Sequence, residues 1–149
     1  MATPQETVES DLRAALKAGD KEKLATLRLL LADVKNERIR RGPEVDAETF
    51  AGLVRKAIKQ RGEAAEQFRA GGRLELAEKE EREAAILEAY LPQQAGEAEI
   101  RAAIAAFAAA EGLSGPKGIG PVMRAMLARF GATADGATIN RLAREVLGG

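Results

Sequence analysis

The 149-residue sequence contains no cysteine and no histidine. The lack of cysteine excludes disulfides, thiolate nucleophiles and cysteine-ligated zinc or iron–sulfur sites. The lack of histidine removes the usual general base near neutral pH and the commonest metal ligand. Chemistry would fall to carboxylates, lysine, arginine or hydroxyl groups, and the sequence offers no recognisable nucleophile–base arrangement. We expect no catalytic residue, no metal, no cofactor and therefore no enzyme activity.

Aromatic residues are scarce, with four phenylalanines, one tyrosine and no tryptophan. Hydrophobic residues still make up 46% of the chain, so the core must be built mainly from leucine, isoleucine, valine and alanine. Alanine, leucine, glutamate, lysine and arginine dominate the sequence, and these are strong helix formers. The composition therefore predicts an all-α fold.

Long apolar runs are also missing. No stretch approaches the roughly 18 apolar residues that a membrane-spanning helix needs. The first residues, MATPQETVESDL, have neither the basic start nor the apolar run of a secretory signal. We expect no membrane partner and a cytoplasmic location.

The formal net charge is zero, but charges of opposite sign are segregated along the chain. Residues 21–41 carry seven basic and three acidic side chains, and residues 55–73 carry six and two. Residues 74–100 carry two basic and eight acidic side chains. Such blocks are candidates for contacts with partners of opposite charge.

Hydrophobic periodicity and helix punctuation predict seven helices. Three are expected in residues 5–18, 21–41 and 47–70, and Pro92 should end a fourth. Three shorter helices are expected in residues 97–111, 119–130 and 136–147. The polar segment after Pro92 is the predicted boundary between a four-helix N-terminal domain, 1–93, and a three-helix C-terminal domain, 94–149.

One charged residue, Arg61, lies in the middle of the apolar stripe of the third predicted helix. Glu80 and Glu83 lie within the apolar stripe of the fourth predicted helix, which consists of Leu76, Leu87 and Tyr90. A charge on an apolar face normally needs a partner. If the chain reverses between these helices, Arg61 should form a structural ion pair with Glu80 or Glu83.

The segment from residue 57 to residue 94 carries a family resemblance. Its motifs are Lys59-Gln60-Arg61, Gln67-Phe68, Gly72-Arg73, Leu76-Ala77-Glu78-Lys79-Glu80 and Tyr90-Leu91-Pro92. With these motifs the chain resembles the GatB/YqeY family, whose free-standing members are similar to the C-terminal tail of the tRNA amidotransferase B subunit. The resemblance implies a two-part helical fold and a non-catalytic accessory module that binds tRNA. It also implies the amidotransferase, or another protein of the tRNA charging pathway, as a protein partner.

Two groups of basic residues in the N-terminal part are candidate RNA contacts. Lys21, Arg28 and Lys35 recur every seven residues, with Arg38 one turn further on, and could follow a phosphate backbone. The second group is Arg55, Lys59 and Arg73. Alternatively, all of them are boundary residues that pair with acidic neighbours.

A third candidate group lies in the C-terminal part and consists of Lys117, Arg124, Arg129, Arg141 and Arg144. The segment GPKGIGP around Lys117 has the glycines of a phosphate-binding loop, but lacks the Gly-Lys-Ser/Thr ending. A turn that leads into the next helix is the favoured interpretation.

Two functions follow from these patterns. The first is an accessory module that binds tRNA. The alternative is a protein-docking module without RNA binding, whose acidic fourth helix or tail contacts a partner. RNA binding should weaken steeply with salt, whereas a docking module should expose an apolar patch.

Overall fold

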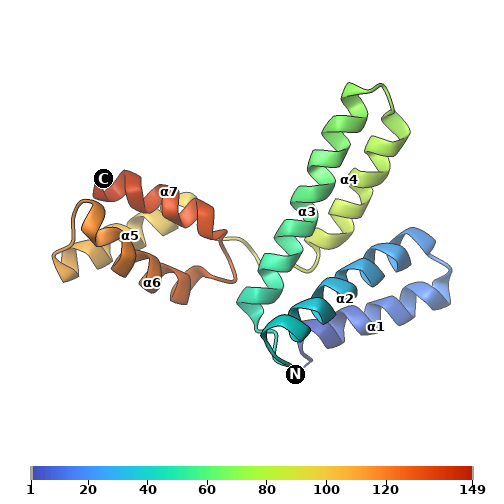
Figure 1. Cartoon of the computed structure of the whole chain (residues 1–149), viewed down its shortest axis with the longest axis horizontal. Helices are drawn as coiled ribbons and strands as arrows, with labels where there is room; N and C mark the ends of the chain where they lie inside the picture. The colour runs from blue at the N-terminus through green and yellow to red at the C-terminus, as the bar shows by residue number, and fades with distance from the viewer. Residues whose placement is uncertain (1, 149) are drawn as a thin grey trace. The chain divides into compact units, whose positions relative to one another are not determined.

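The computed structural model describes residues 2–148, which form seven α-helices and one short 3-10 turn without any strand (Figure 1). The predicted all-α class is confirmed. The elements are α1 (Pro4–Ala18), α2 (Lys21–Arg41), α3 (Ala47–Ala70), α4 (Leu74–Glu88), α5 (Glu97–Glu111), η1 (Pro116–Gly118), α6 (Ile119–Phe130) and α7 (Gly136–Leu147).

Local capping sets most of the helix ends. The carboxylate of Asp20 accepts a hydrogen bond from the backbone N–H of Lys23, and Asp46 accepts one from Thr49 at 2.8 Å. Gly19 closes α1 in the left-handed conformation, with φ 73°, which a residue with a side chain rarely adopts. One end differs from the expectation, because α4 stops at Glu88 and a turn follows it before Pro92.

The chain divides into two compact units after Pro92, where the sequence suggested a boundary after residue 93. In the first unit, the hairpin of α1 and α2 packs with the hairpin of α3 and α4. Its buried core contains residues from all four helices: Val8, Leu27, Leu30, Val34, Phe50, Val54, Ala57 and Leu87.

Leu76 does not share this core. The predicted apolar stripe of α4 included it, but its side chain is 40% exposed. Leu76 lies near the turn between α3 and α4, which is the end of the hairpin furthest from Leu87. The stripe is therefore covered at one end of α4 only.

The second unit begins at Gln93 and is a three-helix bundle with its own core. Ile104 of α5, Val122 and Met126 of α6, and Ile139 and Leu142 of α7 are at most 3% exposed. Each helix therefore contributes one apolar face to a shared centre, as expected for amphipathic helices.

Gly118 is a point of close packing in the second unit. A Cβ atom at this position would lie 3.2 Å from Leu113 Cβ and 3.3 Å from Leu147 Cδ1. These distances are shorter than ordinary van der Waals contacts. Because glycine has only a hydrogen in place of a side chain, η1 can approach the end of α7 closely at this position. None of the helices within residues 2–148 has both the length and the apolar character required to cross a membrane.

Candidate nucleic-acid interface

One side of α2, beside its buried face, carries three exposed cations at a seven-residue spacing. Leu27, Leu30 and Val34 are buried on the inner face. Lys21, Arg28 and Lys35 flank this buried face along one side of the helix and are exposed; together they form the α2 cationic row.

A seven-residue repeat drifts by only about 20° around a straight helix and advances by about 10 Å. The row is therefore nearly parallel to the helix axis. None of its three side chains has an ion pair or hydrogen bond with another side chain of residues 2–148.

The other basic residues at the end of α2 have intramolecular partners. Arg38 donates a hydrogen bond from its guanidinium to Gln5 Oε1 of α1 at 3.3 Å. Arg41 Nε lies 2.9 Å from Glu37 Oε1, and Arg40 also approaches this carboxylate. Because Glu37 is only 7% exposed, its two arginine neighbours balance a charge that would otherwise be buried alone.

The second predicted group is spread along α3 rather than gathered in one patch. Arg55 is partly buried and interacts within the structure. Lys59 is exposed in the middle of the helix, and Arg73 is exposed at the turn that leads to α4. More than two helical turns of α3 separate Lys59 from Arg73, so these residues do not act as a single site.

The third predicted group is divided between paired and unpaired side chains. Arg141 of α7 lies 2.7 Å from Glu97 of α5 and 3.2 Å from Glu145. Arg101 lies 2.7 Å from Glu145 and joins the same network. The hydrogen bonds to Glu97 and then Glu145 raise the pKa of Arg141, so this arginine is held in a contact between α5 and α7.

The remaining basic residues of the second unit keep exposed charge. Arg144 donates to Asn140 Oδ1 at 2.8 Å, and the Arg129 guanidinium lies 4.9 Å from the centre of the Phe130 ring. Lys117 and Arg124 are exposed on η1 and α6. None of these four cations has a carboxylate partner among residues 2–148.

The predicted structural pair lies between α3 and α4. Arg61 Nε is 3.4 Å from Glu83 Oε2, and the two side chains are 12% and 13% exposed. The contact is an ion pair without a directional hydrogen bond from Nε, while Nη1 of Arg61 donates to the Ala57 carbonyl at 3.1 Å. Burial raises the pKa of Glu83, Glu80 raises it further, and Arg61 opposes both effects.

Two further contacts join distant parts of the sequence and were not predicted. Arg82 of α4 binds both carboxylate oxygens of Glu22 on α2, at 2.8 and 3.3 Å. The Tyr90 hydroxyl donates a 2.6 Å hydrogen bond to Asp11 of α1. These partners are 60 and 79 residues apart, so no local spacing in the sequence points to them.

The fold and the exposed cations define a class: a two-unit, all-helical protein with basic residues presented on helix faces. The chain belongs to the Yqey-like protein family, whose model matches residues 5–147. This match confirms the family resemblance of the motifs around Gly72 and Tyr90.

Three relatives illustrate the range of similarity. The chain is 30% identical, over 155 aligned positions, to "Altered inheritance of mitochondria protein 41, mitochondrial" of Pyrenophora tritici-repentis, covering 99% of this chain and 84% of that protein. A protein of the same name from Lachancea thermotolerans is 37% identical over 100 residues, covering 65% of this chain and 54% of that protein. An uncharacterised protein of Schizosaccharomyces pombe is 32% identical over 91 residues, covering 61% of this chain and 74% of that protein. The chain thus spans about half the length of the Lachancea relative.

These names correct one expectation from the sequence. The cytoplasmic location is wrong by this comparison, because similar proteins are named as mitochondrial. The expectation rested on the lack of a secretory signal and of a membrane-spanning run. Neither feature distinguishes the cytosol from the interior of an organelle.

Proposed function

We propose that this protein is a non-catalytic accessory module that binds tRNA through the α2 cationic row. The observation that carries the proposal is the arrangement of Lys21, Arg28 and Lys35, which are exposed, without partners in residues 2–148, and aligned on one helix. Many other basic residues of the chain are already neutralised by carboxylates, including Arg61, Arg82 and Arg141.

Phosphate contacts explain how such a row would work. Each neutralised phosphate contributes about 0.7 to 0.9 to the slope of log affinity against log salt. Three contacts would therefore reduce affinity by about 20- to 40-fold between 50 and 200 mM salt. The row would bind the RNA backbone, since stacking on bases requires aromatic rings, and α2 contains none.

The resemblance to the tail of the tRNA amidotransferase B subunit supports tRNA as the RNA. The amidotransferase, or another protein of the tRNA charging pathway, would then act on the bound tRNA. The chain itself would supply binding and orientation, while the chemistry takes place on the partner.

The test compares two variants that lose the same amount of charge. In the row variant Lys21, Arg28 and Lys35 are replaced by glutamine, and in the tail variant Lys117, Arg124 and Arg129 are replaced by glutamine. Binding of bulk tRNA is measured across a salt series by filter binding or anisotropy. We expect the native chain and the tail variant to show similar slopes, and the row variant to lose about 2 to 3 units of slope.

Each result has a definite meaning. If only the tail variant loses slope, tRNA binding still stands as the function, but its site lies in the second unit and not on the α2 cationic row. Equal losses in both variants would show a diffuse charge effect and would refute a specific row. No binding by the native chain even at low salt would refute the proposed function.

A further inference from the structure

The outer half of the α3–α4 hairpin extends beyond the core of the first unit. The residues that α3 and α4 contribute to the core of the first unit, Phe50, Val54, Ala57 and Leu87, lie in the halves that are distant from the connecting turn. Further out, the buried side chains are small: Ala65 and Ala77 are 5% and 0% exposed. Figure 1 shows the end of this hairpin projecting away from α1 and α2.

Ion pairs and alanine packing hold the projecting part together. Arg61 pairs with Glu83, and Arg69 pairs with Glu81 closer to the turn. The backbone N–H of Arg73 donates to the Phe68 carbonyl at 2.7 Å and closes the turn. The end of the hairpin is therefore ordered by its own contacts, which limits the conformational entropy that a binding partner would have to overcome.

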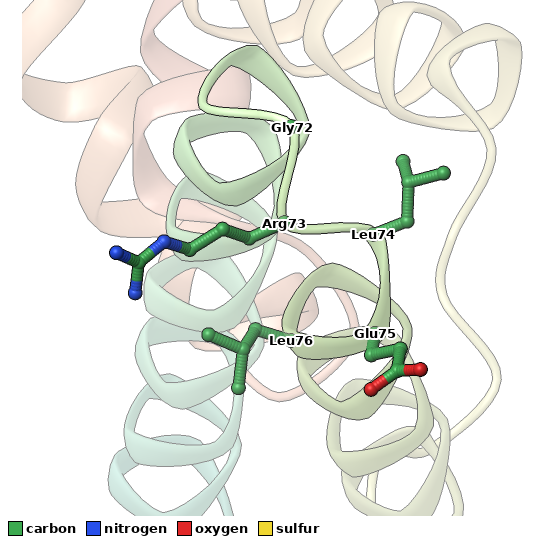
Figure 2. Close-up of a pocket in the computed structure, with 5 residues that line it drawn as sticks. All are labelled: Gly72, Arg73, Leu74, Glu75 and Leu76. Carbon is green, nitrogen blue, oxygen red and sulfur yellow. The ribbon is translucent and has the colours of Figure 1, made fainter.

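Two large apolar side chains are exposed at this ordered end. Leu74 is 54% exposed and Leu76 is 40% exposed. With Gly72, Arg73 and Glu75 they line a hollow of about 420 Å³ (Figure 2). We call these five residues the hairpin tip. In Figure 2 Leu74 points to the side of Glu75 and Leu76 to the side of Arg73, so Leu74 is the apolar side chain that lies beside a carboxylate.

The charges beside Leu74 indicate the kind of partner. Figure 2 shows Leu74 and Glu75 on one side of the turn, with Arg73 pointing to the other side. Glu78 follows Leu74 by four residues and therefore lies on the same face of α4. Glu75 and Glu78 are both exposed, and neither has a hydrogen bond or close ion pair within residues 2–148. Glu78 also attracts Arg82, one turn further along α4.

We propose that the hairpin tip docks a basic, apolar segment of a partner protein. An apolar side chain of that segment would cover Leu74, while lysine or arginine residues beside it would meet Glu75 and Glu78. A nucleic acid would not suit this face, because two exposed carboxylates would repel its phosphates. The proposal concerns α4 and does not depend on RNA binding by α2.

The experiment uses the full chain and a fluorescently labelled synthetic helical peptide of leucine and lysine, with leucine at every third or fourth position. Anisotropy gives its Kd for the native chain and for Leu74→Ser and Glu75→Lys/Glu78→Lys. The matched controls are Leu16→Ser, whose leucine is 57% exposed on α1, and Glu63→Lys/Glu66→Lys, an equal charge change on α3. Circular dichroism checks that all variants keep the native helix content.

We expect each tip variant to weaken peptide binding at least tenfold, and each control variant to change it less than twofold. Amide shift changes in the labelled chain should centre on residues 73–79. Equal weakening by tip and control variants would show non-specific attraction and overturn the proposal. Absence of peptide binding to the native chain would overturn it as well. Dimerisation of the native chain that Leu74→Ser abolishes would assign the surface to a second copy instead.

Discussion

Removing Arg61 should cost more stability than removing the charge of its partner Glu83. Replacement of Arg61 by methionine leaves the Glu83 carboxylate, which is 13% exposed, without its nearest cation. Replacement of Glu83 by glutamine removes the charge but leaves a side-chain oxygen that can face Arg61. Arg61 also keeps its hydrogen bond to the Ala57 carbonyl. Each substitution leaves one charge without its counter-ion, but the remaining charge keeps different polar contacts. Arg61 retains the Ala57 carbonyl, whereas Glu83 retains no hydrogen bond within residues 2–148.

The expected magnitudes follow from the burial of the pair. Removing one partner of a fully buried ion pair costs about 3 to 5 kcal/mol. Both side chains here remain 12% and 13% exposed, so water still screens their charges in part. We therefore expect Arg61→Met to reduce the free energy of unfolding by about 1 to 3 kcal/mol at pH 7. Glu83→Gln should cost less than about 1 kcal/mol, because burial already disfavours the charged form and raises its pKa. The double variant should lose less than the sum of the two single losses.

The pH dependence gives a second, independent check. A carboxyl whose pKa is raised by folding binds its proton more tightly in the folded state, so it favours folding at low pH. This contribution is lost as the pH rises through the folded-state pKa. Without Arg61 the pKa of Glu83 should rise further, and the loss caused by Arg61→Met should therefore shrink between pH 7 and pH 5.

The assay is urea unfolding followed by tyrosine fluorescence. Tyr90 is the only tyrosine and the chain has no tryptophan, so this signal reports on the first unit. A loss below about 0.5 kcal/mol for Arg61→Met at pH 7, or a loss that grows on acidification, would refute the reasoning.

Two further predictions concern the Tyr90 hydrogen bond and the glycines of the second unit. Burial, and then the bond to Asp11, raise the pKa of Tyr90; absorbance titration of the native chain should therefore give a midpoint above 10, and Asp11→Asn should lower it. The stability that depends on the neutral phenol of Tyr90 should be present below pH 10 and lost as the pH rises through the folded-state pKa. An unchanged titration midpoint of Tyr90 in Asp11→Asn would contradict this contact. Gly118→Ala should destabilise the second unit by about 1 to 3 kcal/mol in thermal unfolding followed by circular dichroism. Gly120→Ala, whose nearest neighbour is the flexible Arg124 side chain at 3.7 Å, should be neutral or slightly stabilising, and equal losses at both glycines would be inconsistent with the close packing.

Helix positions could be predicted from the sequence because their signals are local. Asp20 and Asp46 cap the helices that follow them, and Gly19 ends the helix that precedes it. The expected ranges 97–111, 119–130 and 136–147 agree with the bounds of α5, α6 and α7. In each case the decisive atoms belong to residues within one helical turn of the helix end.

The pairing of charges could not be predicted in the same way. Arg28 and Arg141 look equivalent in the sequence, since both are exposed positions on amphipathic helices. In the structure Arg141 binds Glu97, 44 residues away, whereas Arg28 has no partner in residues 2–148. Which cations remain available to a ligand therefore depends on how the helices pack.

The sequence by itself determined the all-α class, most of the helix bounds and the family, because composition, capping and short motifs are properties of neighbouring residues. It also placed Arg61 on an apolar face, which required a partner from another helix. Only the tertiary structure decided that Leu76 is exposed at the hairpin tip, that Tyr90 contacts Asp11, and which basic residues are neutralised. These features depend on distances between residues far apart in the chain, and such distances are set by helix packing.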